Sequence, residues 1–421
     1  MLTIALFVVF FALLVLNIPI AIGLGMSSLI GFTFGGLSFD AIAGTMYASL
    51  SKFVLLAIPF FILAGNIMEK SGISTKLIDL ASSFVGHKKG GLAIVCIIVC
   101  CFFAAISGSG PATVAALGVI MIPAMVEIGY KPAFAAALMA AGGAIGVIIP
   151  PSIPFVIYGS ITNVSIGDLF KSGILPGILV GTILITTALF VTRNEDIKVR
   201  PKATWKERTI AFKNAFWGLM MPVIILGGIY GGIFTPTEAA AVAAVYGFIV
   251  GFFIYRSLNF KSFVQILRDT VAQTGVIMMI IATASLFAYV LTIDGAARTL
   301  TQMLASYAGD SIFKYFIAFN IVLLIAGCFL EATSALYIIA PIFFPVAMQL
   351  GIDPIHLGCV MVINLAIGQL TPPVGVNLFV ACGIGKVSIK EITVKILPLV
   401  GIFIVALLMI TYIPQICLAL V

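Results

Sequence analysis

The sequence contains little charge. Asp, Glu, Lys and Arg make up only 9% of its 421 residues, whereas soluble proteins carry roughly a quarter. Hydrophobic residues reach 62%, which excludes an ordinary soluble domain. We therefore predict an all-α polytopic membrane protein. Apolar runs of about the length that crosses a bilayer lie at 2–23, 52–68, 91–106, 132–149, 174–192, 215–233, 237–255, 275–293, 313–330, 355–370 and 396–413.

Histidine is scarce too, since His87 and His356 are the only two and lie far apart. HExxH, GxSxG and P-loop motifs are missing. The seven cysteines are scattered through apolar runs without the spacing of metal ligands, so we expect them to pack as small apolar residues. We predict that the protein is not an enzyme and has no organic cofactor.

The few charged residues are unevenly placed. Residues 193–213 hold seven Lys or Arg side chains against three acids. The positive-inside rule therefore assigns this loop to the cytoplasm. Binding of nucleic acid or anionic lipid is the alternative explanation for a basic loop. Membrane topology accounts for it, so we predict contact with membrane lipid and no nucleic-acid partner.

A proline doublet, Pro150-Pro151, interrupts the apolar segment 142–158, and the pattern returns 222 residues later as Pro372-Pro373 in 364–380. Two successive prolines remove two backbone donors and disfavour helix before them, so each segment should form two half-helices. Paired interrupted segments in two halves of a chain indicate the binding site of a secondary transporter. The alternative is a pair of packing kinks.

The return of this pattern at an offset of 222 residues indicates an internally duplicated chain. We expect its two repeats to be inverted. The domains predicted from it are N-terminal scaffold helices at 1–51, a first repeat at 52–190, a connector with the basic loop and two spans at 191–274, a second repeat at 275–412 and a tail at 413–421. The N-terminal segment 1–22, which contains most of the first apolar run, is expected to be a retained span and not a cleaved signal peptide.

Each repeat also contains a polar tip between two apolar arms, which predicts a re-entrant hairpin. In the first repeat the run 91–126 carries Ser107-Gly108-Ser109-Gly110-Pro111. In the second, the arms 312–330 and 335–348 flank Glu331, Thr333 and Ser334. Glu331 is either a functional ionisable group at membrane depth or a carboxylate that caps the second arm.

Each repeat thus offers a hairpin tip and an unwound link, and together these four broken helix ends would meet at such a site. Helix C-termini and bare carbonyls attract Na⁺, whereas helix N-termini attract carboxylates. Hard oxygen ligands suit an alkali cation better than a transition metal. Because the tips and links contain no Lys or Arg, an acid would be bound by dipoles, hydroxyls, co-bound sodium and the amides of Asn364, Gln369 and Asn377.

Three helix starts carry the S/T-x-x-D/E pattern of a capping box. Thr235 with Glu238 opens an alanine-rich helix, and the other two patterns pair Ser165 with Asp168 and Ser388 with Glu391. For Glu238 a functional role is the alternative to capping.

Four motifs follow one another along the chain: ISGSGPATVAALG (106–118), GAIGVIIPPSIPFVIYG (143–159), FTPTEAAAVAAVYG (234–247) and GQLTPPVGVNLF (368–379). With them the sequence resembles the large membrane subunit, DctM type, of the tripartite ATP-independent periplasmic (TRAP) transporters. The resemblance implies an elevator-type transporter with two re-entrant hairpins and two discontinuous helices in the bacterial inner membrane. It also implies sodium-driven uptake of small organic acids such as C4-dicarboxylates or sialic acid.

The resemblance further implies two partners, a small four-helix membrane subunit (DctQ type), expected as a separate chain, and a periplasmic substrate-binding protein (DctP type). The sodium ligands that it implies are Ser107, Gly108, Gly110, Gly146, Pro150, Glu331, Thr333, Gly368, Thr371 and Pro372. The substrate-binding residues that it implies are Ser107, Ser109, Pro151, Ser334 and Asn377. The alternative function is a passive channel or a non-transporting membrane scaffold.

Overall fold

In the computed structural model, the described residues 2–195, 197–199 and 201–421 form helices and no strand. Within these residues, nine helices are long and apolar enough to cross a membrane. The prediction of an all-α polytopic membrane protein is therefore confirmed.

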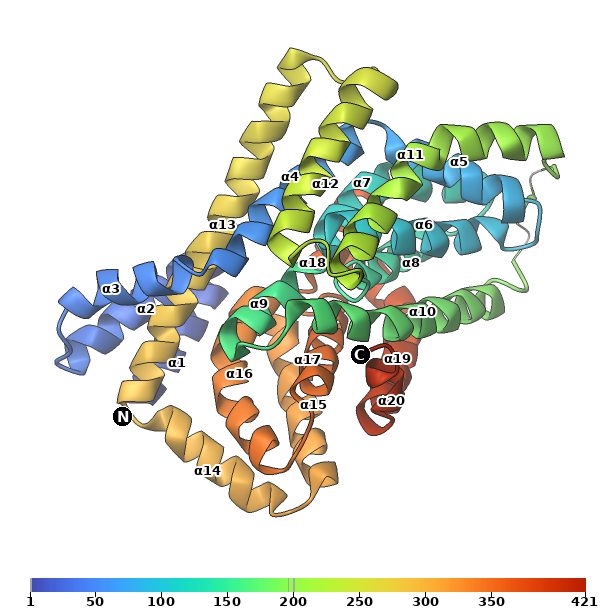
Figure 1. Cartoon of the computed structure of the whole chain (residues 1–421). Coiled ribbons are helices and arrows are strands. Elements are labelled where there is room, and N and C mark those ends of the chain that lie inside the picture. Colours follow the sequence, from blue (N-terminus) through green and yellow to red (C-terminus); the bar gives the residue numbers. More distant parts are fainter. Residues whose placement is uncertain (1, 196, 200) are drawn as a thin grey trace.

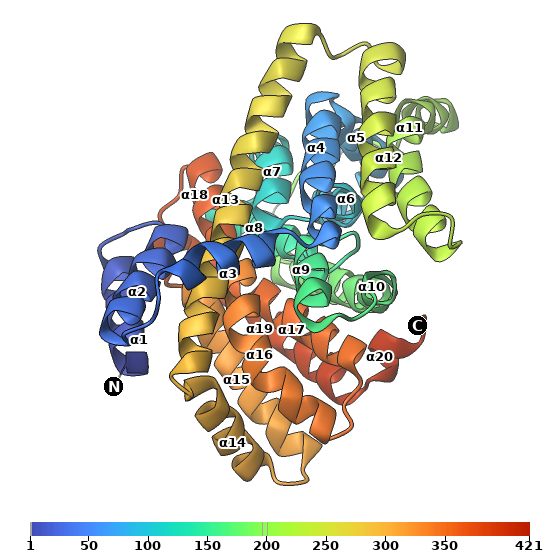
Figure 2. The same cartoon turned by 60° about the vertical axis from the view of Figure 1, so that its left-hand side comes forward.

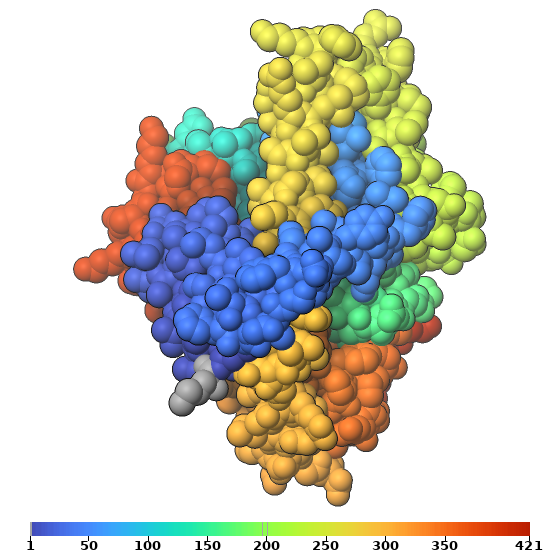
Figure 3. Space-filling view, turned by 90° about the vertical axis from the view of Figure 1, so that its left-hand side faces the viewer, coloured from blue at the N-terminus to red at the C-terminus, as the bar shows by residue number. Residues whose placement is uncertain are grey.

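The N-terminal region forms a separate helical layer against one long helix. It consists of α1 (Leu2–Val15), α2 (Ile20–Phe34) and α3 (Asp40–Leu50). The prediction of one continuous span at 2–23 is wrong. The helix ends at Val15 and restarts only after Pro19, which has no backbone donor and disfavours helix before it. Figure 3 shows these helices (blue) lying across α13 (Phe260–Ile293, yellow), against which α2 and α3 pack.

The scaffold wall is built from α4 and helices of the connector. In this wall α12 and α13 both pack on α4, whereas α5 packs on α11. The elements are η1 (Phe53–Leu56), α4 (Ala57–Lys70), α5 (Ile73–Val85), α11 (Trp205–Tyr230), α12 (Pro236–Ile249) and the π-helical turn η2 (Val250–Ile254).

Two of the three predicted capping boxes are complete. At the start of α12, the Thr235 side chain accepts from the Glu238 N–H and the Glu238 side chain accepts from the Thr235 N–H. Ser388 and Glu391 form the same two hydrogen bonds further along the chain. Ser165 accepts from the Asp168 N–H, but the Asp168 carboxylate binds Lys171 at 2.8 Å. The shorter aspartate side chain thus forms an ion pair in place of the second arm of the box.

The first repeat contains the predicted hairpin and the predicted broken helix. The hairpin arms α6 and α7 are separated by two residues, and residues 146–152 leave the helical path between α8 and α9. The elements are α6 (Gly91–Ser107), α7 (Gly110–Glu127), α8 (Pro132–Ile145), α9 (Ile153–Thr162) and α10 (Ile166–Val191).

The second repeat has the same order of elements. Its hairpin arms α15 and α16 meet at Leu330 and Glu331, and residues 369–375 interrupt the helix between α17 and α18. The elements are α14 (Ala296–Ala308), α15 (Ile312–Phe329), α16 (Ala332–Gln349), α17 (Pro354–Gly368), α18 (Val376–Gly385), α19 (Ile389–Tyr412) and the short α20 (Gln415–Leu418).

The two repeats interlock through matching elements. The half-helix α9 of the first repeat packs on α16 of the second, and its counterpart α18 packs on α7 of the first. In Figures 1 and 2 the α6–α7 hairpin lies in the upper part of the molecule and the α15–α16 hairpin in the lower part. The two tips therefore approach the middle of the protein from different ends.

Candidate functional site

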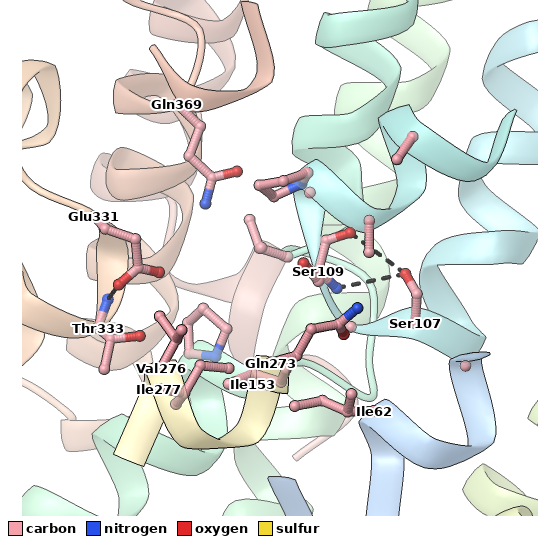
Figure 4. Close-up of a pocket in the computed structure, with 18 of the residues that line it drawn as sticks. Ile62, Ser107, Ser109, Ile153, Gln273, Val276, Ile277, Glu331, Thr333 and Gln369 are labelled. Carbon is pink, nitrogen blue, oxygen red and sulfur yellow. Dashed lines mark hydrogen bonds between the residues drawn. The ribbon is translucent and has the colours of Figure 1, made fainter. Parts of the chain in front are cut away.

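A cavity of about 480 Å³ lies where the first tip, the second tip and the scaffold wall meet. Figure 4 shows Ser107 and Ser109 on one side, Glu331 and Thr333 on the other, and Gln369 reaching in from the second link. The scaffold side is contributed by α4 and α13 through Ile62, Gly65, Asn66, Glu69, Gln273, Val276, Ile277 and Ile280.

The first tip turns sharply at Gly108. Its φ of +61° lies in the left-handed region, which favours glycine. This turn ends α6 at Ser107 and sets Ser109 in an extended conformation before α7. The Ser107 and Thr113 hydroxyls lie 2.9 Å apart, and the Thr113 hydroxyl donates to the Ser109 carbonyl at 2.8 Å.

These oxygens surround the end of α8 at Gly146. A Cβ at this position would lie 2.7 Å from the Gly143 carbonyl oxygen, 2.8 Å from Thr113 Oγ1 and 3.0 Å from the Ser109 carbonyl oxygen. The absence of a side chain thus lets hard oxygen atoms converge on Gly146, and such oxygens are the ligands that alkali cations prefer. Predicted sodium residues Ser107 and Gly146 meet here, and Thr113, absent from that prediction, joins them.

Each tip is bonded to the link of its own repeat. The Ile153 N–H donates to the Gly108 carbonyl at 3.4 Å, and the Val374 N–H donates to the Cys328 carbonyl at 3.2 Å. A Cβ on Gly108 would lie only 2.8 Å from the Pro151 carbonyl oxygen. The exposed peptide groups of tip and link therefore face each other in both repeats.

The second tip is closed by its own carboxylate. Glu331 precedes α16 as its N-cap residue, and its Oε2 accepts from the Thr333 N–H at 2.9 Å. Glu331 also lines the cavity. The sequence left open whether Glu331 caps α16 or acts as a functional ionisable group. The structure contains the cap, and the same residue lines the cavity.

Side chains from the second link and from the start of α18 reach the first tip. A Cβ on Gly110 would lie 2.3 Å from Gln369 Oε1 and 3.0 Å from Asn377 Oδ1. Asn377 is fully buried and donates to the Ala140 carbonyl at 3.3 Å. In the part of the chain that the structure describes, Gln369 Oε1 and Asn377 Oδ1 have no hydrogen-bond partner. Two buried acceptor oxygens are thus available beside the first tip.

The predicted site residues divide into two groups. Those in the cavity wall are Ser107, Gly108, Ser109, Gly110, Glu331 and Thr333. Those outside its lining are Gly146, Pro150, Pro151, Ser334, Gly368, Thr371, Pro372 and Asn377. Gly368 packs on Gly327 of α15, since a Cβ on Gly327 would lie 3.0 Å from the Gly368 Cα. Ser334 is fully buried in α16.

Sequence reasoning missed the scaffold side of the cavity. Asn66 and Glu69 stand one turn apart on α4, and Asn66 donates to the Thr270 hydroxyl at 3.0 Å. Gln273 follows one turn later on α13 and lines the cavity with Asn66 and Glu69. The available signal was a polar stripe at helical spacing within two spans.

The sequence was also compared with known proteins. The family model for the tripartite ATP-independent periplasmic transporter, DctM component, matches residues 7–416. The chain belongs to this family. It is therefore a multi-pass protein of the bacterial inner membrane and a TRAP large permease.

Relatives that are named for different cargoes resemble this permease. It is 44% identical to the isethionate TRAP transporter permease protein DctMQ of Oleidesulfovibrio alaskensis, covering 97% of the chain and 64% of that relative. It is 43% identical to the C4-dicarboxylate TRAP transporter large permease protein DctM of Vibrio cholerae, covering 97% and 95%. It is 37% identical to the sialic acid TRAP transporter large permease protein SiaM of the same organism, covering 90% and 88%.

Among solved structures, the permease is similar to MtrF of Neisseria gonorrhoeae. The TM-score is 0.63 at 15% identity, covering 88% of this chain and 83% of that one. At this identity the similarity concerns the fold alone. These relatives are transport proteins, in agreement with the prediction of a transporter that is not an enzyme.

Proposed function

We propose that this permease couples the inward movement of sodium to the uptake of small organic acids. The observation that carries the proposal is the meeting of both hairpin tips and a residue of the second link at one cavity. None of the described residues that line the cavity is Lys or Arg. An acid bound there needs charge compensation from helix termini and from co-transported cations.

Two features support roles for particular residues. The N-terminus of α7 receives no hydrogen bond from a side-chain cap, so its first N–H groups and the hydroxyls of Ser107 and Ser109 suit a carboxylate. Sodium would be held by the oxygens of Ser107, Thr113 and Gly143 around Gly146. In the second repeat, Glu331, Thr333 and Thr371 would supply oxygens beside Gly368 and Pro372.

An elevator motion is the transport step that we propose. The hairpins and broken helices of the two repeats interlock through α9 with α16 and α18 with α7, so they can move as one body past α4 and α13. The cavity lies between this body and the scaffold wall, as the motion requires. A separate DctQ-type subunit and a DctP-type binding protein complete the proposed transporter.

The substrate is proposed to be a small organic anion of the kind that the relatives' names contain. C4-dicarboxylates, sialic acid and isethionate all carry a negatively charged acid group at neutral pH. Because the tip residues Ser107 and Ser109 offer donors that suit any of these groups, they support the class of substrate and not one compound.

The test is uptake into proteoliposomes that contain the permease, a DctQ-type subunit and a DctP-type binding protein, with and without a sodium gradient. We expect Ser107→Ala and Thr371→Val to abolish sodium-dependent uptake. Unchanged sodium dependence in both variants would contradict the proposal. Continuous current without saturation or need for the binding protein would favour a passive channel instead.

A further inference from the structure

The two hairpin tips present opposite electrostatic character to the cavity. At the first tip, α7 is 18 residues long and its N-terminus receives no side-chain cap, so partial positive charge faces the site. At the second tip, Glu331 caps α16 and neutralises that helix end. An acid group is therefore attracted to the first tip and repelled by the second.

Between the tips lies an amide without a counterpart in the first repeat. Gln369 stands where the repeat offset of 222 residues places Val147 in the first half, and Glu331 similarly replaces Ser109. Gln369 is only 7% exposed, and among the described residues no group donates to its Oε1. Its side chain lines the cavity and points into it in Figure 4.

The unused acceptor restricts the ligand. A buried acceptor without a donor is costly, and a ligand that supplies the donor removes this cost. Carboxylates and sulfonates carry acceptors only, so they leave Gln369 Oε1 without a donor. A hydroxyl both donates and accepts, which matches an amide.

We propose that Gln369 is a specificity-determining residue that hydrogen-bonds a hydroxyl group of the substrate. The substrate class is a hydroxylated organic acid, with its acid group at the N-terminus of α7 and its hydroxyl at Gln369 Oε1, beside Gly110. This inference rests on the proposed function, because it assumes that the cavity binds the transported acid.

Matched pairs of acids that differ by one hydroxyl test the inference. The pairs are malate with succinate, lactate with propionate, and 2-hydroxyethanesulfonate with ethanesulfonate. Binding of each acid to the purified permease in nanodiscs is measured calorimetrically with sodium and with choline in its place. In at least one pair we expect the hydroxylated member to bind about tenfold more tightly.

The Gln369→Val variant inserts valine, the residue at the matching position 147 of the first repeat. It is expected to bring the ratio of the two affinities within that pair close to one. Gln369→Asn keeps an amide and is expected to retain part of the preference, which separates lost recognition from a folding defect. Gln302→Val, on the exposed face of α14 away from the cavity, is the matched control and should leave the ratio unchanged.

The outcomes separate the two proposals. If sodium-dependent binding is seen but the affinities are equal within every pair, the role of Gln369 is overturned and the proposed function is not. The same holds if the affinity ratio is unchanged in Gln369→Val. If none of the six acids binds in a sodium-dependent manner, the proposed function itself is overturned. A hydroxyl preference that is lost in Gln369→Val and kept in Gln302→Val supports both.

Discussion

At the residue scale, the site depends on positions where a side chain is missing. Gly146 leaves room for the oxygens of Gly143, Ser109 and Thr113, and Gly110 leaves room for the amides of Gln369 and Asn377. Glycine contributes here by letting polar atoms converge on one point. The chemistry of the site therefore comes largely from backbone carbonyls, hydroxyls and amides.

Thr113 provides a test of the proposed sodium site. Thr113→Val keeps the shape of the side chain but removes the hydroxyl that lies between Ser107 Oγ and the Ser109 carbonyl. We expect the sodium concentration for half-maximal uptake to rise about tenfold, because one oxygen ligand is lost. Titration of sodium-dependent uptake measures the change.

Thr182 offers the matched control for this variant. Its hydroxyl also donates to the carbonyl four residues earlier, at 2.8 Å, but it lies on α10 away from the cavity. Thr182→Val should leave the sodium titration unaltered. Equal effects of the two substitutions would argue against sodium binding at Thr113.

Gly368 tests the close approach of two helices. A Cβ on Gly368 would lie 2.5 Å from the Cα of Gly327 and 2.7 Å from its carbonyl oxygen. Because backbone atoms cannot rotate away, Gly368→Ala should lower the stability of the permease by about 1–3 kcal/mol. A fall in the thermal unfolding temperature in detergent measures this.

Gly383, on the other half of the same broken helix, has no atom within 4 Å of an added Cβ. Gly383→Ala should therefore unfold at the temperature of the unmodified protein. Because alanine favours a helix more than glycine does, an equal loss of stability in both variants would mean that the contact with Gly327 does not determine the effect.

At the element scale, helix ends receive their partners from side chains close in sequence. The capping box of Thr235 and Glu238 satisfies the start of α12, and Glu238 does not line the cavity. The bonds are local, so a sequence pattern of four residues is enough to predict them. This explains why the cap of α12 was predictable, whereas the scaffold side of the cavity was not.

Thr235→Ala tests whether this element is purely structural. We expect a stability loss of about 1 kcal/mol, since the variant removes an N-cap hydroxyl. The sodium dependence of uptake should remain that of the unmodified permease. Altered sodium dependence at normal thermal stability would instead give this helix end a transport role.

At the scale of the whole molecule, the hairpins and broken helices of the two repeats pack on one another beside a wall that contains α4, α12 and α13. The first tip touches this wall directly. A Cβ on Gly65 of α4 would lie 3.8 Å from the Cβ of Ser107, a distance typical of disulfides. The proposed elevator motion must break this contact.

A disulfide across this contact is expected to stop transport. The reduced Gly65→Cys/Ser107→Cys double variant keeps a polar atom at position 107 and is expected to retain measurable uptake, unlike Ser107→Ala. Oxidation should lower this uptake to the background level, and a reducing agent should restore the level of the unoxidised double variant. Uptake is measured before and after reduction, and maleimide-PEG labelling counts the free thiols. Full uptake with the disulfide formed would contradict movement of the tip relative to α4.

The matched control lies within the scaffold. A Cβ on Gly247 of α12 would lie 3.7 Å from the Cβ of Ile67 on α4, so Gly247→Cys/Ile67→Cys can form a similar bond. Both helices belong to the same wall in the proposed motion. Oxidation of this pair should therefore leave uptake unchanged.

The sequence by itself determined the membrane class, the two hairpins and the two helix breaks. Apolar run length and proline doublets act over short stretches, so their effects can be predicted without long-range contacts. One break was missed, at Pro19, because the apolar run 2–23 continues through it. The run is long enough to cross a bilayer, so the single proline within it was not interpreted as a helix break.

Only the tertiary structure decided which polar groups share the cavity. It places Gln369 of the second repeat beside Gly110 of the first, and it brings Asn66, Glu69 and Gln273 of the scaffold to the same space. These positions are up to hundreds of residues apart, and their proximity depends on how α9, α16, α7 and α18 interlock. Local sequence patterns contain no information on such packing, because it is determined by contacts between complete helices.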